Sequence, residues 1–268
     1  MSQPASLAPR IDAPASGKAA AQENFPVASR LLPAAYRADI LDFYRFARRA
    51  DDIADHPDLT PDEKLARLAQ IEAELPVHPA AALYGRELLV AFRQDAVQSR
   101  YADWPALMGY CRYSAAPVGR FLLDLFGEDR SLWPRADALC AALQVLNHLQ
   151  DCGDDYRVLD RVYLPQDWLA ADGVSDAALA GGTTPPALRR TLDRTLAETT
   201  ALLDTSRPFI RQIQHRGLRV QAAIVQACGE RLLARLRRQD PLVGRVRLTA
   251  LDRLRCAVTG LVTGWRAA

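Results

Sequence analysis

The stretch YRFARRADDIADHPD, residues 44–58, combines a helical pattern with three closely spaced carboxylates, at Asp51, Asp52 and Asp55. Carboxylates at this spacing repel one another, and aspartate is a poor residue for a helix interior because its side chain competes for backbone hydrogen bonds. The segment is therefore either a helix end that faces water or a site where a cation sits against the carboxylates.

The helical repeat gathers the polar side chains of this stretch on one side. Tyr44, Arg48, Asp51 and Asp55 fall within about 60° of one another around the helix axis, and the apolar residues between them lie off this stripe. An aromatic hydroxyl, a guanidinium and two carboxylates one turn apart thus share one face.

A second segment, LCAALQVLNHLQDCGDDY at residues 139–156, has the same design. Gln144, Asn147, Asp151 and Asp155 fall within about 80° of one another. Each segment could be an amphipathic surface helix with its polar face in water. Three features favour a binding site instead: the stripes use side chains that offer oxygens, the pattern occurs twice, and arginines flank both copies at Arg48, Arg49, Arg157 and Arg161.

The two stripes together indicate a site for diphosphate and metal ions. Mg²⁺ is held by a few carboxylates together with water and substrate phosphate oxygens, and arginine adds bidentate phosphate contacts. Neutralised diphosphate becomes a leaving group, and a carbocation then remains in the apolar space between the helices. A glycosidase acid and base fit less well, because that chemistry does not need four carboxylates.

The rest of the chain has a helical pattern almost throughout. A Pro/Ala/Ser-rich segment at residues 1–22 is expected to be a disordered leader, and residues 23–268 are expected to form one all-α domain. We predict helices near residues 34–55, 61–74, 79–97, 104–126, 133–155, 186–204, 207–215, 217–239 and 248–265. Thr60, Pro61 and Glu63 form a helix start with a capping box.

Composition favours a protein of the cytoplasm. Hydrophobic residues make up 49% and charged residues 25% of the 268 residues, as in ordinary globular proteins. Five scattered cysteines without a CxxC pair indicate a reducing compartment, and neither a membrane span nor a signal-peptide core is present in the sequence.

Charge is concentrated at the C-terminal end. Residues 205–268 carry thirteen arginines against three acidic residues, whereas the whole chain has a net charge of only +2. This basic region could be a solvated face or a surface for anionic lipid at the inner side of the cell membrane. A nucleic-acid surface is the least favoured of the three, because aromatic residues are not interleaved with the arginines.

The two aspartate segments resemble a known family. DDIAD at residues 51–55 and NHLQDCGDD at residues 147–155 are similar to the two aspartate-rich motifs of the squalene/phytoene synthase family, and the resemblance covers roughly residues 23–255. It implies an all-helical isoprenoid synthase bundle with a central active-site cavity. It also implies that Asp51, Asp55, Asp151 and Asp155, with Asn147, hold Mg²⁺ and a prenyl diphosphate substrate.

The same resemblance implies roles for further residues. Arg48 and Gln144 match polar residues upstream of the two motifs. YCRYSAAPVG at residues 110–119 resembles the pocket helix of the family, with Tyr110 as its active-site tyrosine and with Ala115 and Gly119 leaving room for isoprenoid chains. DRVYLP at residues 160–165 places Arg161 and Tyr163 near diphosphate. Tyr44 and Arg157 complete the expected substrate-binding set.

Within the family, ENFPVASRLLP, YSAAPVGR and NHLQDCGDDY look most like the hydroxysqualene synthase branch of hopanoid biosynthesis. That resemblance implies ionisation of presqualene diphosphate, rearrangement of the cation and a quench by water without NADPH, with His148, Asn147 and Tyr110 as groups that position the water. Two alternatives stay open: head-to-head condensation of two prenyl diphosphates, and a non-catalytic helical assembly factor. The sequence does not indicate an oligomeric state.

Overall fold

The computed structural model describes residues 32–266, so the expected leader at residues 1–22 lies outside the described residues. The chain is all-α, as predicted. Its α-helices are α1 (Ala34–Ala54), α2 (Pro61–Glu72), α3 (Pro79–Asp95), α4 (Trp104–Ser114), α5 (Ala116–Leu125), α6 (Trp133–Leu159), α7 (Gln166–Ala171), α8 (Pro186–Ser206), α9 (Arg216–Leu236) and α10 (Ala250–Arg266).

Local sequence signals set several helix boundaries. At the start of α2, the Thr60 side chain accepts a hydrogen bond from the backbone N–H of Glu63, and the Glu63 carboxylate accepts one from the backbone N–H of Thr60. This is the predicted capping box. At the start of α4, the Asp103 carboxylate accepts a hydrogen bond from the backbone N–H of Ala106 in the same way.

The prediction of one helix over residues 104–126 is wrong, because the segment forms two helices, α4 and α5. The chain breaks at Ala115, where φ is −127° and ψ is −46°. Pro117 explains the break: it has no backbone N–H to donate, and its ring would clash with the carbonyl group four residues earlier in a continuous helix. Of the segment predicted helical at 207–215, Arg207–Gln212 is a 3-10 helix. The sequence did not predict the short helix α7 or the 3-10 turns at Arg130–Leu132 and Asp176–Ala180.

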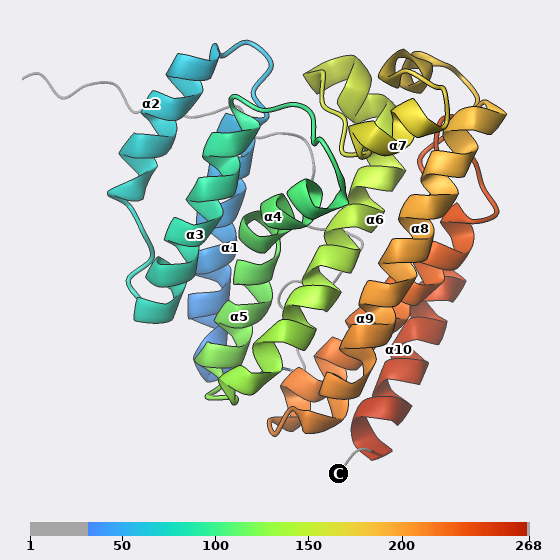
Figure 1. Ribbon diagram of the computed structural model, residues 1–268. Coiled ribbons are helices and arrows are strands. Elements are labelled where there is room, and N and C mark those ends of the chain that lie inside the picture. The colour runs from blue at the N-terminus through green and yellow to red at the C-terminus, as the bar shows by residue number, and fades with distance from the viewer. Residues whose placement is uncertain (1–31, 267–268) are drawn as a thin grey trace, which may run out of the picture.

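Two groups of buried side chains hold the helices together. One joins α1, α2 and α3 to one side of α5, and the other lies among α4, α6, α8, α9 and α10. Leu122, Phe126 and Trp133 pack against both groups. Figure 1 shows the long helix α6 running between the two halves, with α10 at the outer edge beside α9.

The close packing of α10 on α9 depends on glycine. A methyl group at Gly260 would lie 2.6 Å from backbone atoms of Ile224, and one at Gly264 would lie 2.8 Å from the Cα atom of Val220. Both distances are shorter than any real carbon contact, so a side chain at either position would push the helices apart.

The direction of the helices positions the predicted site. The helices α1, α3 and α6 all end at the upper end of the bundle in Figure 1, which brings residues from distant parts of the sequence together there. Within residues 32–266 the sole strand-like pairing is an isolated bridge between Arg100 and Val162. None of the helices described in this range is long and apolar enough to cross a lipid bilayer.

Candidate active site

The last turns of α1 carry the first aspartate motif. Arg48 lies between two carboxylates: its Nη1 is 3.0 Å from Oδ2 of Asp51, and its Nη2 is 3.0 Å from Oδ1 of Asp52. Burial raises the pKa of Asp51 to about 7, and the neighbouring charge of Asp55 adds to the effect. The motif therefore holds more negative charge than Arg48 alone neutralises.

Arg161, which follows α6, supplies a second cation to this motif. The chain can return toward α1 because Asp160 takes up a left-handed conformation, with φ of 50°. The buried Arg161 then donates through Nη1 to Asp55, and through Nη2 to the backbone carbonyl groups of Ala54 at 2.9 Å and Asp95 at 3.1 Å. The structure thus brings Arg161 to the first motif.

Asp95, at the end of α3, is a site residue that sequence reasoning missed. Tyr110 donates to its Oδ2 at 2.9 Å and Tyr163 donates to its Oδ1 at 3.5 Å. Burial raises the pKa of Asp95 to about 7 against the opposing effect of Arg161. One signal could have identified it: a carboxylate in the last turn of a helix is unfavourable for the helix dipole.

His148 lies next to this tyrosine pair. Its ring stacks on Tyr163 with centroids 3.5 Å apart and an interplanar angle of 12°, and Tyr110 is 6.0 Å away. Burial, with the nearby charge of Arg161, lowers the pKa of His148 to about 3, so the imidazole is neutral at physiological pH. Its buried Nε2 has no hydrogen-bond partner in the described part of the chain.

The second motif lies on α6, where Gln144, Asn147, Asp151 and Asp155 share one side of the helix. Asp151 is held by Arg245, which donates through Nε to Oδ1 and through Nη2 to Oδ2 at 2.8 Å. Arg245 is the second residue that the sequence did not reveal, since it lies in the loop between α9 and α10, far from either motif. Tyr163 lies near Asp155 of the second motif as well as Asp95 and Arg161, and Arg161 in turn contacts Asp55 of the first motif.

Two predicted residues are not brought into this cluster. Arg157 donates to Asp154 at 2.6 Å and to the backbone carbonyl of Leu179 at 3.5 Å, on the side of α6 away from Asp151. Ala115 is buried at the break between α4 and α5, outside the lining of the cavity described next. The catalytic and binding roles of all these residues stay predictions.

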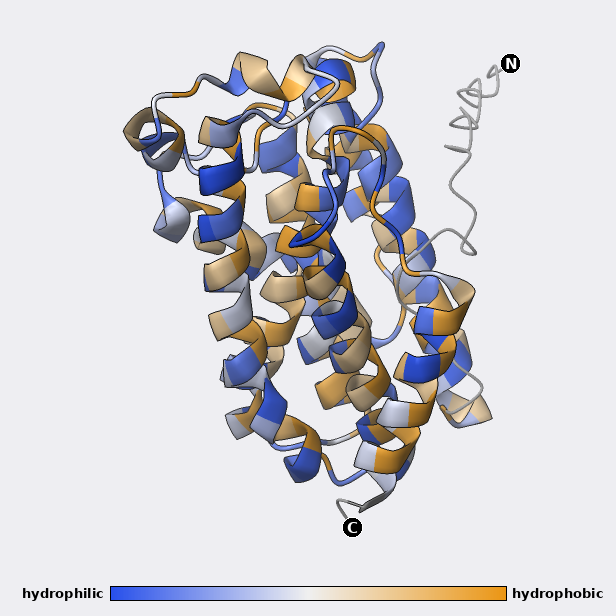
Figure 2. Cartoon of the chain, turned by 90° about the vertical axis from the view of Figure 1, so that its right-hand side faces the viewer, coloured by the Kyte–Doolittle hydropathy of each residue, from blue (hydrophilic) through white to orange (hydrophobic). Residues whose placement is uncertain are grey.

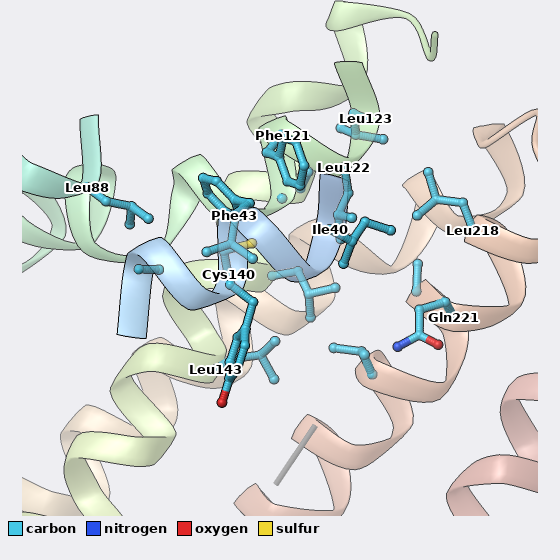
Figure 3. Close-up of a pocket in the computed structure, with 18 of the residues that line it drawn as sticks. Ile40, Phe43, Leu88, Phe121, Leu122, Leu123, Cys140, Leu143, Leu218 and Gln221 are labelled. Atoms are coloured by element: carbon cyan, nitrogen blue, oxygen red, sulfur yellow. The ribbon is translucent and has the colours of Figure 1, made fainter. Parts of the chain in front are cut away.

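A cavity of about 390 Å³ extends from the first motif into the bundle. Its polar end is formed by Tyr44, Arg48 and Asp51, and most of its wall is apolar. Figure 3 shows side chains of α1, α5, α6 and α9 surrounding it, and labels Ile40, Phe43, Leu88, Phe121, Leu122, Leu123, Cys140, Leu143, Leu218 and Gln221. The rings of Phe43 and Phe121 stack with centroids 4.2 Å apart.

Gly119 provides part of the space at this wall. A methyl group there would lie 2.7 Å from the sulfur of Cys140 on α6. Gly119 therefore lines the cavity. Its expected role, leaving room for isoprenoid chains, stays a prediction.

The carboxylates suit Mg²⁺ as an open site. In the part of the chain that the structure describes, no group of three or more acidic, histidine or cysteine side chains encloses a metal position. Mg²⁺ does not require such a cage, because it keeps several waters and shares substrate phosphate oxygens. Burial first, and then the charge of Asp55, raises the pKa of Asp51, and a divalent cation bound there would favour the ionised carboxylate. The donor set is hard oxygen, as Mg²⁺ prefers.

The chain is similar to several known proteins over most of its length. A hydroxysqualene synthase of Rhodopseudomonas palustris is 44% identical over 254 residues, which cover 88% of this chain and 87% of that protein. The crystal structure of squalene synthase HpnC from Alicyclobacillus acidocaldarius is 30% identical, with a TM-score of 0.66, over 80% of this chain and 87% of the other. A dehydrosqualene synthase structure with ligand, 21% identical, has the same fold, with a TM-score of 0.77 over 91% of this chain and 92% of the other.

The sequence model of the squalene/phytoene synthase family matches this chain over residues 18–82 and 76–255. These residues include both aspartate motifs, the Tyr110 helix and the segment with Arg161 and Tyr163. The chain belongs to the squalene/phytoene synthase family.

Proposed function

We propose that this protein is an enzyme that converts presqualene diphosphate and water into hydroxysqualene and diphosphate, in squalene and hopanoid biosynthesis. The observation that carries the proposal is the cavity of about 390 Å³ with an apolar wall and a polar end at Arg48 and Asp51. This shape suits a substrate with a charged diphosphate head and hydrocarbon chains. The 44% identical hydroxysqualene synthase supports this substrate and product.

The residues proposed to hold Mg²⁺ are Asp51, Asp55, Asp151 and Asp155, with Asn147. When bound, Mg²⁺ would neutralise diphosphate and so make it a better leaving group. Arg48, Arg161 and Arg245 each already pair with a carboxylate of the motifs. Two further residues are proposed as substrate contacts: Gln144 from the resemblance to the family, and Arg157 because it flanks the second motif in the sequence.

The chain's own residues then control the fate of the cation. The carbon–oxygen bond to diphosphate breaks and both electrons leave with the diphosphate. The cyclopropylcarbinyl cation rearranges in a space whose apolar wall excludes most water, and the aromatic faces of Phe43 and Phe121 are suited to stabilise positive charge.

A water molecule ends the reaction when its oxygen bonds to carbon, and one of its protons passes to the departed diphosphate or to solvent water. His148 is proposed to hold this water, because the imidazole is neutral and its Nε2 accepts no hydrogen bond within the described residues. It lies beside Arg161 and Tyr163, outside the residues that line the cavity. Tyr110, which donates to Asp95, and Asn147 are the other groups proposed to position it. No nicotinamide cofactor is part of the proposed reaction.

Head-to-head condensation of two prenyl diphosphates is the second candidate. The 30% identical squalene synthase from Alicyclobacillus acidocaldarius supports it. A non-catalytic assembly factor is disfavoured, since a scaffold has no use for Asp51 and Asp95, whose burial raises the pKa of each carboxyl to about 7.

Incubation of the purified protein with Mg²⁺ and presqualene diphosphate in ¹⁸O-labelled water tests the proposal. The expected product is hydroxysqualene with one labelled oxygen, formed without NADPH. Parallel incubation with farnesyl diphosphate tests the condensation. Squalene formed only with NADPH, or no consumption of presqualene diphosphate, would contradict the proposal.

The substrate and the product are both lipids. The proposed function therefore includes peripheral contact with an anionic membrane. The membrane would supply the substrate and receive the product.

A further inference from the structure

The outer face of α10 is apolar and exposed. Six large side chains on this face are each between 42% and 62% exposed: Leu251, Leu254, Val258, Leu261, Val262 and Trp265. Their spacing of three and four residues places them on one stripe about 100° wide along the whole helix. Figure 2, which views the bundle from the side of α10, shows hydrophobic residues along the full length of this helix. We call these six residues the α10 stripe.

The α10 stripe is not the face by which the helix packs. The opposite face of α10 carries Asp252, Cys256, Gly260 and Gly264, which are buried, and the two glycines allow direct contact with α9. In a soluble bundle the large apolar side chains of an edge helix normally face the core. In α10 the packed face uses small residues and the large apolar side chains are exposed. Contiguous exposed apolar patches of this kind mark interaction sites.

Three arginines without acidic partners lie near the N-terminal half of the stripe. Arg255 is about 20° from one edge of it, Arg253 is about 80° beyond the other edge, and Arg247 lies in the loop before α10. Arg247, Arg253 and Arg255 are exposed, and within residues 32–266 none of them lies within ion-pair distance of a carboxylate. The acidic groups nearest in sequence are already engaged: Asp252 binds Arg231 and Arg235. Positive charge at the border of the stripe is therefore available to a partner.

We propose that the α10 stripe docks on an anionic lipid bilayer, with α10 lying in the plane of the interface. An apolar face bordered by arginine is the chemistry of helices that lie in the headgroup region, and a tryptophan such as Trp265 suits that depth. The arginines complement anionic headgroups.

A second copy of this chain is the weaker candidate for the same surface. A two-fold contact would place the same patch on both sides. Arg255 of each copy would then lie at the edge of an apolar contact, with no acidic residue in the opposite stripe to pair with.

The docking rests on the proposed function, because an enzyme with a lipid substrate needs access to a membrane. The docking is tested without substrate, so that its failure can be distinguished from failure of the proposed function. Flotation of the full chain with vesicles of phosphatidylglycerol and phosphatidylcholine, against pure phosphatidylcholine, measures the partition coefficient. Wild type should float with the anionic vesicles and be released as NaCl rises from 0.1 to 0.5 M.

Two double variants remove the two parts of the surface. Arg253→Gln with Arg255→Gln should lower partitioning roughly 30-fold, at about five-fold per arginine near an anionic surface. Leu254→Glu with Val258→Glu should lower it by at least the same factor, since charge replaces buried apolar area.

Matched controls carry the same changes elsewhere. Val77→Glu alters a fully exposed valine in the loop between α2 and α3, and Arg45→Gln with Arg86→Gln removes two exposed arginines from α1 and α3. Both should float as wild type does. Circular dichroism and melting curves establish that every variant is folded.

Three results would overturn the proposal. The first is that the wild-type chain floats with neither kind of vesicle. The second is that the α10 variants float as the controls do. The third is that the wild type sediments as a dimer and that Leu254→Glu with Val258→Glu converts it to a monomer. The last result would assign the stripe to a second copy of the chain.

Discussion

Replacing Asp51 with asparagine should stabilise the metal-free protein while it abolishes most of the activity. Burial and Asp55 raise the folded-state pKa of Asp51 from 3.8 to about 7. Above pH 7 the folded protein therefore holds a charged group that the unfolded chain would hold at lower cost. Below pH 4 the carboxyl is protonated in both states and the cost disappears. The destabilisation by Asp51 thus grows as pH rises from about 4 and is complete above about 7.

The size of the effect follows from this shift. A difference of about three pKa units corresponds to ~4 kcal/mol. The Asp51 side chain is 38% exposed, however, and Arg48 is 3.0 Å away, so solvent screening reduces the figure to ~1–2 kcal/mol. For a chain of this size, that gain corresponds to a rise in melting temperature of ~2–6 °C at pH 8.

The assay is thermal unfolding in EDTA at pH 8 and at pH 4.5, followed by turnover with saturating Mg²⁺. Asp51→Asn should raise the melting temperature at pH 8 and change it little at pH 4.5. Turnover should fall by at least ~100-fold if the carboxylate supplies ~3 kcal/mol to ionisation. Asp42→Asn is the matched control, because Asp42 is an exposed aspartate of the same helix that pairs with Arg45 at 3.4 Å.

Two results would refute the reasoning. Unchanged turnover in Asp51→Asn would remove this carboxylate from the reaction. A lower melting temperature at pH 8 would mean that the ion pair with Arg48 stabilises the fold more than the carboxylate repulsion weakens it.

Three more variants test other parts of the structure. Arg245→Gln should lower stability by ~2 kcal/mol in EDTA, since it leaves Asp151 without its bidentate partner, and Mg²⁺ should restore much of the loss in a thermal-shift assay. Gly119→Val should cost ~1–3 kcal/mol in unfolding free energy and raise KM, because the added carbon atoms meet Cys140 at the cavity wall. Burial alone would raise the pKa of Asp252, but hydrogen bonds from its neighbours hold that pKa well below 3.8. Its stabilisation is therefore complete above about pH 4 and declines gradually in acid as pH falls toward the depressed folded-state pKa. Asp252→Asn should reduce stability more at pH 7 than at pH 2 in urea unfolding.

Sequence predicted what short-range periodicity controls. The stripe of Tyr44, Arg48, Asp51 and Asp55 depends only on helix geometry, and α1 has these residues on its final turns as expected. The Thr60 capping box likewise needs residues only three apart. The break at Ala115 was missed, although Pro117 is a local signal, because the apolar pattern continues across it.

Contacts between segments far apart in the chain could not be predicted from the sequence. Asp95 is a single aspartate at the end of an ordinary amphipathic helix, and nothing in its neighbourhood shows that Tyr110 and Tyr163 will meet it. Arg245 is one of thirteen arginines in the last 64 residues, and only the folded chain singles it out. Periodicity also identified α10 as a helix but could not show that its glycine face packs on α9 while its large apolar side chains are exposed.

The arginines change the meaning of the aspartate motifs. From spacing alone, the carboxylates are expected to be unpaired until a metal ion binds. In the folded chain each of three carboxylates pairs with an arginine: Asp51 with Arg48, Asp55 with Arg161 and Asp151 with Arg245. These arginines reduce the repulsion that four nearby carboxylates would otherwise impose on the metal-free fold. They are also the groups best suited to bind phosphate oxygens. A divalent cation that arrives with a diphosphate brings both signs of charge, so carboxylates and arginines can each exchange one partner for another without leaving a buried charge unpaired. In the proposed site an isolated cation would leave the arginines without a counter-charge, so we expect Mg²⁺ with diphosphate to bind more tightly than Mg²⁺ alone.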